Sequence, residues 1–81
     1  MAIKQKIGDR IKSIRTERQI SQEHLANISQ VDRTFVNHVE NGRRNISVDS
    51  LEKILIGLEI SFRDFFDDSL FENTEKGVKW V

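Results

Sequence analysis

Four residues of the kind that caps helices occur at intervals along this chain. Ser21, Asp32, Ser47 and Ser61 each stand directly before a segment rich in helix-forming residues. A short oxygen-bearing side chain at such a position accepts a hydrogen bond from a free backbone N–H group of the first helical turn. Proline, which would interrupt such helices, is absent. Alternation of apolar and polar residues is scarce, so we predict an all-α fold rather than a sheet.

Apolar residues recur at helical spacing within the segments. Before the first capping residue, steps of four, four and three residues separate Ile3, Ile7, Ile11 and Ile14. These residues share one face of a helix. Gly8 within this segment marks either a later helix start, near Asp9, or a close contact with another helix. The segment after Ser47 has a corresponding inward face made of Leu51, Ile54, Leu55 and Leu58.

The length of the chain, 81 residues, fits one domain with a small core. We expect five helices in one domain over residues 1–68. The last, short helix begins after Ser61, and residues 69–81 form a tail with no predicted structure. The chain has no cysteine and only two histidines, too few for a four-ligand zinc site. Helix packing and oligomerisation must therefore provide the stability.

Several function classes leave no trace in the sequence. No run of about eighteen apolar residues indicates a membrane span, and charges interrupt the N-terminus too often for a signal peptide. No nucleophile motif, glycine-rich phosphate loop or acid pair indicates catalysis. The lack of cysteine fits a reducing compartment. We therefore expect a cytoplasmic protein that is not an enzyme and uses no cofactor or metal.

The net charge of zero hides an asymmetry between the two halves. Residues 1–46 hold nine Lys/Arg against five acids, whereas residues 47–81 hold four against eight. The first half is suited to meeting a polyanion and the second to another partner. An ordinary solvated surface explains the charges at least as well, so charge alone does not decide the function.

The segment from Ser21 to Glu40 predicts two short helices joined by a tight turn. Ala26 is small enough for the two helices to cross closely, and Val36 is placed to pack the second against the first. The turn residue of such a pair favours positive φ and is most easily glycine. Here it is Gln30, which costs about 1 kcal/mol if the left-handed conformation is kept. A generic helical hairpin is the alternative.

Most of the chain resembles a known class of DNA-binding domain. The similarity to the lambda-repressor/Cro class covers roughly residues 7–66 and rests on QEHLANISQVDRTFVNHVENGRR, the following NIS and a helix beginning VDSLEKIL. Within that class, DRTF followed by VENGRRNIS is similar to the small controller proteins of restriction–modification systems. This resemblance implies an all-helical homodimer that binds a palindromic double-stranded DNA operator and regulates its own operon. RNA polymerase is a further candidate partner.

The second helix of this pair carries polar side chains on one expected outer face. Arg33 lies in its first turn, and its planar fork can bond O6 and N7 of guanine together. Asn37, one turn later, offers the amide that pairs with adenine, and Thr34 a hydroxyl and a methyl group. His38 borders this face. We predict that these four residues read bases; a salt bridge at Arg33, and plain solvation at Thr34 and Asn37, are the alternatives.

Contacts to the DNA backbone are expected around this helix. Gln22 begins the preceding helix, where free backbone N–H groups favour a phosphate. The loop after the second helix, in which Gly42 favours the helix end, supplies cations and amides from Asn41, Arg43, Arg44 and Asn45. By the resemblance, one arginine of this loop also reaches a base; a solvated loop is the alternative.

For two residues of the second helix, Phe35 and Glu40, the sequence allows two different contacts each. Phe35 either packs against the preceding helix or contacts a phosphate and a thymine methyl group; the similar controller proteins often have tyrosine there. Glu40 is expected to pair with Arg10 or Arg15 of the first helix and to hold the second helix in place.

The C-terminal half has more apolar surface than one small core readily hides. An exposed apolar patch rimmed by acids suits self-association, and two-fold dimers are the commonest assembly. We predict that eight residues form a homodimer interface: Leu55, Ile56, Leu58, Glu59, Ile60, Phe62, Phe65 and Phe66. Completion of the monomer core by the same residues is the alternative.

A second class of function is left open by the acidic half of the chain. On the same fold, an antitoxin-like or bridging protein-interaction module would use this half to bind another protein. We favour the DNA-binding regulator, because Arg33, Thr34 and Asn37 share one face of a capped helix and are followed by NGRRN.

Overall fold

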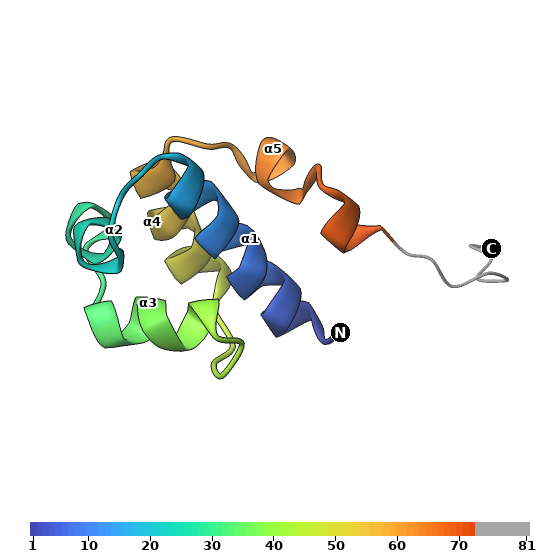
Figure 1. Cartoon of the computed structure of the whole chain (residues 1–81), viewed down its shortest axis with the longest axis horizontal. Helices are drawn as coiled ribbons and strands as arrows, with labels where there is room; N and C mark the ends of the chain where they lie inside the picture. Colours follow the sequence, from blue (N-terminus) through green and yellow to red (C-terminus); the bar gives the residue numbers. More distant parts are fainter. Residues whose placement is uncertain (73–81) are drawn as a thin grey trace, which may run out of the picture.

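The computed structural model describes residues 1–72, so the predicted tail lies outside the described residues from position 73 onward. Within residues 1–72 the chain forms only helices: α1 (Ile3–Glu17), α2 (Gln22–Ser29), α3 (Arg33–Glu40), α4 (Val48–Leu58), α5 (Phe62–Phe66) and the short 3-10 helix η1 (Ser69–Phe71). The predicted all-α fold with five α-helices is confirmed (Figure 1). None of the helices in this part of the chain is long and apolar enough to cross a membrane.

The helices start where the sequence predicts. Each of the four capping side chains accepts a hydrogen bond from a backbone N–H group two or three residues further on, at 2.9–3.1 Å. This confirms the N-cap positions of Ser21, Asp32, Ser47 and Ser61. Such bonds satisfy donors that the first helical turn leaves free, so the start of each helix is fixed locally.

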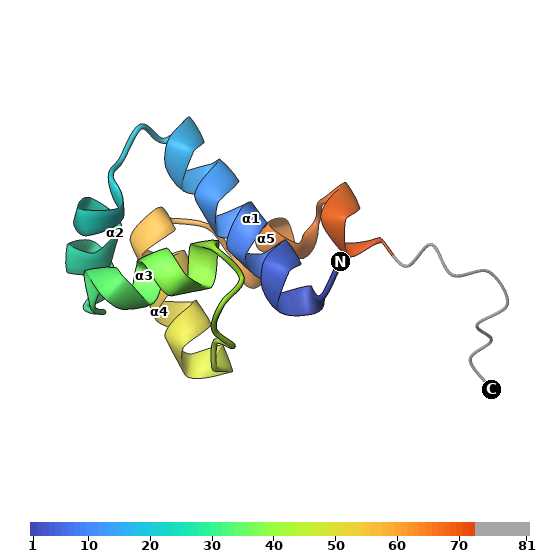
Figure 2. The same cartoon turned by 60° about the horizontal axis from the view of Figure 1, so that its bottom comes forward.

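One apolar core lies between the helices. α1 packs against α3, and α2 packs against both α3 and α4. The fully buried side chains include Ile11, Ile14, Leu25, Val36, Val39, Ile54, Leu58 and Phe65. Ala26 is 2% exposed and Val36 is fully buried, as expected for the crossing of α2 and α3. The rotated view brings α3 to the front, where no other helix of residues 1–72 covers it (Figure 2).

Gly8 marks a close helix contact and not a late helix start. α1 begins at Ile3. A Cβ atom added at Gly8 would overlap the carbonyl oxygen of Val39 and lie 3.0 Å from that of Glu40. The backbone of α1 therefore passes directly against the C-terminal end of α3, a distance that only glycine permits. Ile3, at the free end of α1, is exposed, unlike the other isoleucines of its face.

The turn between α2 and α3 keeps its left-handed conformation without glycine. Gln30 has φ 56° and ψ 43°, and the following N–H group, of Val31, donates to the carbonyl oxygen of Ala26 at 3.0 Å. Two other non-glycine residues, Gln19 and Glu59, also have positive φ. Gly42 after α3 has φ 68°, as predicted for the end of that helix.

Ordered packing continues beyond residue 68. Phe71 of η1 packs against Phe65 and Phe66, with ring centroids 5.9 Å and 4.8 Å apart. Arg10 of α1 donates from Nε to the carbonyl oxygen of Phe65 at 2.8 Å and pairs through Nη1 with Asp68 at 3.2 Å. Residues 69–71 thus pack on the domain, and the predicted boundary falls just before η1.

Three of the eight residues predicted for the dimer interface belong to the monomer core. Leu55, Leu58 and Phe65 are at most 2% exposed. Leu55 and Leu58 share the inward side of α4 with Ile54, so helical spacing buries them together. Their assignment to an interface is corrected accordingly. The other five residues stay partly or fully exposed: Ile56, Glu59, Ile60, Phe62 and Phe66.

We predict that Gln30→Gly raises the free energy of unfolding by up to about 1 kcal/mol, because glycine adopts the left-handed conformation without Cβ strain. Urea denaturation followed by circular dichroism measures the change. The matched control is Glu52→Gly, at an exposed right-handed position inside α4, which should lower stability by about 1 kcal/mol. Equal destabilisation by both variants would contradict the prediction.

Candidate nucleic-acid interface

Three of the four predicted base-reading residues meet at one surface hollow. A depression of about 250 Å³ is lined by Gln22, Arg33, Thr34 and Asn37. α3 contributes the last three residues and the start of α2 contributes Gln22. His38 is half-buried and does not line this hollow. The structure therefore brings Arg33, Thr34 and Asn37 together and leaves His38 at their edge.

Arg33 and Thr34 are the two exposed residues of this group. Within residues 1–72 the salt bridge considered for Arg33 is not formed, since the ion pairs there join other residues. The guanidinium keeps its donors in a planar fork that matches O6 and N7 of a guanine. Both side chains are thus available to a ligand on the uncovered side of α3.

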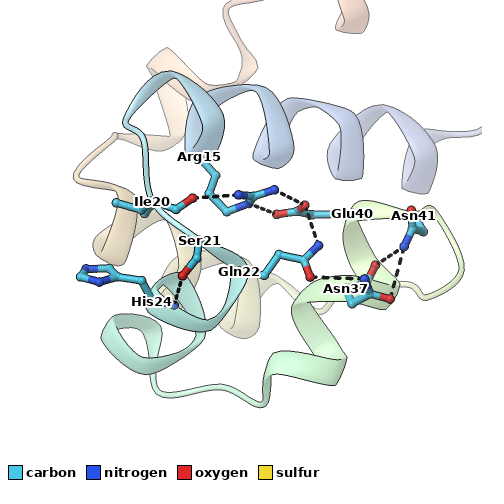
Figure 3. Close-up of polar contacts among 8 residues, drawn as sticks. All are labelled: Arg15, Ile20, Ser21, Gln22, His24, Asn37, Glu40 and Asn41. Carbon is cyan, nitrogen blue, oxygen red and sulfur yellow. Dashed lines mark hydrogen bonds and ion pairs between the residues drawn. The ribbon is translucent and has the colours of Figure 1, made fainter.

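A chain of polar contacts runs from α1 to the hollow (Figure 3). Arg15 donates from Nε to Glu40 Oε2 at 2.7 Å and from Nη2 to Glu40 Oε1 at 3.0 Å. Gln22 Nε2 donates to the same Oε1 at 3.1 Å. Asn37 Nδ2 then donates to Gln22 Oε1 at 3.3 Å. Of the two partners predicted for Glu40, the structure selects Arg15.

Glu40 is 2% exposed. A carboxylate at such a site is costly unless charge and hydrogen bonds compensate its lost hydration. Here Arg15 binds both oxygens in a bidentate pair, and Gln22 supplies a third donor. Arg15 also donates from Nη1 to the carbonyl oxygen of Ile20 at 2.8 Å. The pair therefore ties α1, the segment before α2 and the end of α3 together.

Gln22 and Asn37, predicted for DNA contacts, are already engaged within the protein. Besides the bond between them, Asn41 Nδ2 donates to Asn37 Oδ1 at 3.3 Å and to the carbonyl oxygen of Asn37 at 2.9 Å. Each primary amide nitrogen carries two hydrogens, so Asn37 keeps one donor for a base. The sequence contains one signal for this network, the spacing of four between Asn37 and Asn41 on a helix.

Arg44 lies over the ring of Phe35. Its guanidinium carbon is 4.9 Å from the ring centroid, within the range of a cation–π contact. Phe35 is partly buried against the core, so its ring packs on one side and carries Arg44 on the other. A phenyl ring has no hydrogen-bond donor, so any contact of Phe35 with DNA is apolar. The loop residues predicted to contact phosphate are all exposed: Asn41, Arg43, Arg44 and Asn45.

The helix-turn-helix family model matches residues 11–65, from α1 to α5. The chain belongs to this family. The Control protein C.MunI of a Mycoplasma species is 42% identical over 67 residues, which cover 82% of this chain and 90% of that protein. The Control protein C.BamHI of Bacillus amyloliquefaciens is 34% identical over 70 residues, covering 85% and 86%.

A solved structure shares both fold and sequence with the chain. The restriction–modification controller protein C.Esp1396I, crystallised as a tetramer with its natural 35-base-pair operator, superposes with a TM-score of 0.78 at 41% identity. The match covers 82% of this chain and 87% of that one. These relatives confirm the predicted resemblance to controller proteins, a group of transcription regulators and not of enzymes. They also exclude a generic helical hairpin.

We predict that Arg15→Ala lowers the free energy of unfolding by about 3–5 kcal/mol, because the buried carboxylate of Glu40 loses its charged partner. The control is Lys12→Ala, which removes an exposed cation of the same helix and should change stability by no more than about 0.5 kcal/mol. Urea denaturation of both variants tests this. A similarly small loss in each would show that the ion pair does not stabilise the fold.

Proposed function

We propose that this chain is a controller protein of a restriction–modification system, acting in the cytoplasm as a sequence-specific transcriptional regulator. The observation that carries the proposal is the hollow lined by Arg33, Thr34 and Asn37 on the uncovered side of α3. A relative 41% identical has been crystallised on its operator, which supports double-stranded DNA as the ligand of this surface. The start of α3 enters the major groove, where base edges are distinguishable.

Each residue of the hollow has a role that fits its chemistry. Arg33 binds guanine through two parallel hydrogen bonds, and Thr34 contacts a base edge or a thymine methyl group. Asn37 pairs with adenine through the part of its amide that Gln22 and Asn41 leave free. His38 contacts a base or a phosphate from the border of this surface.

Phosphate contacts come from two places beside α3, the start of α2 and the loop that follows α3. Gln22 reaches a phosphate from the start of α2, with the N–H hydrogen that Glu40 does not use. The exposed loop adds Asn41, Arg43 and Asn45, whose contacts fix register and supply salt-dependent affinity. Arg44, held over the ring of Phe35, stands beside the same groove and contacts a phosphate or a base.

A homodimer would match a palindromic operator. Ile56 is 68% exposed on α4, and Phe62 and Phe66 are 37% and 40% exposed on α5. A second copy would remove this apolar surface from water. Two recognition helices related by a two-fold axis would then meet half-sites about 34 Å apart. The tetramer of C.Esp1396I on its operator supports assembly of this kind, and RNA polymerase is a further partner once the operator is occupied.

We expect Arg33→Ala to lose about 1–3 kcal/mol of binding free energy on the cognate operator and to flatten base preference at one position. Arg43→Ala should instead weaken binding to all duplexes alike and lower the salt slope by about one. Fluorescence anisotropy on operator and scrambled duplexes at several salt concentrations separates the two effects. Equal wild-type affinity for both duplexes would refute sequence-specific regulation.

We expect Ile56→Glu to raise the dimer dissociation constant about tenfold or more, because a charge would be buried without a partner. Sedimentation velocity at several protein concentrations measures it. Val48→Glu is the matched control, since Val48 is 73% exposed on the same helix and lies outside the predicted interface. A wild-type protein that stays monomeric, or an unchanged Ile56 variant, would disprove this interface.

A further inference from the structure

We infer that Glu40 is a positioning residue for base reading: acting through Gln22, its buried carboxylate fixes the orientation in which Asn37 presents its amide to DNA. The inference rests on the proposed function and concerns the same surface. Glu40 is 2% exposed, so it acts from beneath the hollow and not by touching a base.

The first step concerns the amide of Gln22. A carboxylate only accepts hydrogen bonds, whereas a glutamine amide has a donating end and an accepting end. Gln22 must therefore turn its nitrogen toward Glu40, and Nε2 lies 3.1 Å from Oε1. The bidentate pair with Arg15 holds the carboxylate in place, at 2.7 Å and 3.0 Å. This leaves the accepting oxygen of Gln22 facing α3.

The second step passes this orientation to Asn37. The oxygen of Gln22 can only accept, so Asn37 must turn Nδ2 toward it, at 3.3 Å. The oxygen of Asn37 then faces Asn41, whose Nδ2 donates to it at 3.3 Å. Figure 3 shows the three amides in a row between the carboxylate and the end of α3.

The far end of the row favours the same direction, but only through the exposed side chain of Asn41. Asn41 Nδ2 also donates to the backbone carbonyl oxygen of Asn37 at 2.9 Å. A carbonyl oxygen cannot donate, so Asn41 must turn its nitrogen this way. Every hydrogen bond in the row therefore has its donor on the Asn41 side and its acceptor on the Glu40 side. If Asn37 alone flipped, its oxygen would face the oxygen of Gln22 and its nitrogen would face the nitrogen of Asn41, so both hydrogen bonds would be lost.

The orientation matters because adenine offers an acceptor, N7, beside a donor, the N6 amino group. Asn37 retains one N–H hydrogen and one lone pair of Oδ1 for this edge. The nitrogen of this amide lies toward α2, and its oxygen lies toward the C-terminal end of α3. An adenine is bound only when its N7 and N6 lie in the matching order. A freely flipping amide would accept both orders and discriminate less.

A neutral side chain at position 40 would not impose this direction. In Glu40→Gln the new amide can present either its nitrogen or its oxygen to Gln22. Only the 3.3 Å bond from the exposed Asn41 would then favour one orientation of Asn37. In Gln22→Met the ion pair with Arg15 remains but the link to Asn37 is removed. The two variants thus break the same relay at different points, and the second preserves the buried charge pair.

The experiment measures base preference with the full chain on operator duplexes carrying each of the four base pairs at every position. Asn37→Ala identifies the position that Asn37 reads, and Arg33→Ala the position that Arg33 reads. We expect Glu40→Gln and Gln22→Met each to reduce preference at the Asn37 position about tenfold, and to leave preference at the Arg33 position unchanged. Circular dichroism verifies that each variant is folded.

Two further variants separate orientation from general loosening. Glu52→Gln makes the same change at an exposed acid of α4 and should leave all base preferences unchanged. Adding Glu40→Gln to Asn37→Ala should cause no further loss of preference, because the residue it orients is absent.

The outcomes distinguish the inference from the function on which it rests. A wild-type chain without base preference at any position would overturn the proposed function. Preference at the Asn37 position that survives in both Glu40→Gln and Gln22→Met would overturn the inference alone. An equal loss at the Arg33 and Asn37 positions would also overturn it, because loosening of α3 would then explain the result.

Discussion

The ion pair between Arg15 and Glu40 is the interaction on which the arrangement of the hollow between α2 and α3 depends. It joins α1 to the end of α3 and, through Gln22, to the start of α2. A buried pair of this kind contributes little net stability compared with an apolar replacement. Removing one partner nevertheless destabilises the fold strongly, because the other charge stays buried without compensation. Its value here lies in geometry, because helices of eight residues such as α2 and α3 cannot hold a fixed arrangement by themselves.

Features that depend on a few neighbouring residues could be predicted from the sequence. The four capping residues act on N–H groups two or three positions away, and Gln30 takes its left-handed conformation within a single turn. Helical spacing of isoleucines and leucines located α1 and α4. Together with the resemblance of the central segment, these local signals are sufficient to predict five helices, the family and an outer helix face that carries Arg33 and Thr34.

Features that depend on how helices cross could not be predicted in the same way. Gln22 and Asn37 are 15 residues apart, and their contact exists only because α2 and α3 meet at one angle. The contact of Arg44 with Phe35 depends instead on how the loop after α3 folds back over that helix. The sequence assigns Leu58 and Phe65 to an interface because it shows how much apolar surface exists but not which part faces inward, whereas the structure buries both side chains.

The hydrogen bonds from Arg10 to the carbonyl oxygens of Phe65 and Asp64 fix the position of α5 relative to α1. At Gly8 the backbone of α1 lies against α3, and on the other side of α1 the guanidinium of Arg10 donates to the carbonyl oxygen of Phe65. α1 therefore lies between α3 and α5 (Figure 1). In a dimer joined through α5, this arrangement would fix the distance between the two copies of α3. An operator of different spacing would have to twist or bend to fit.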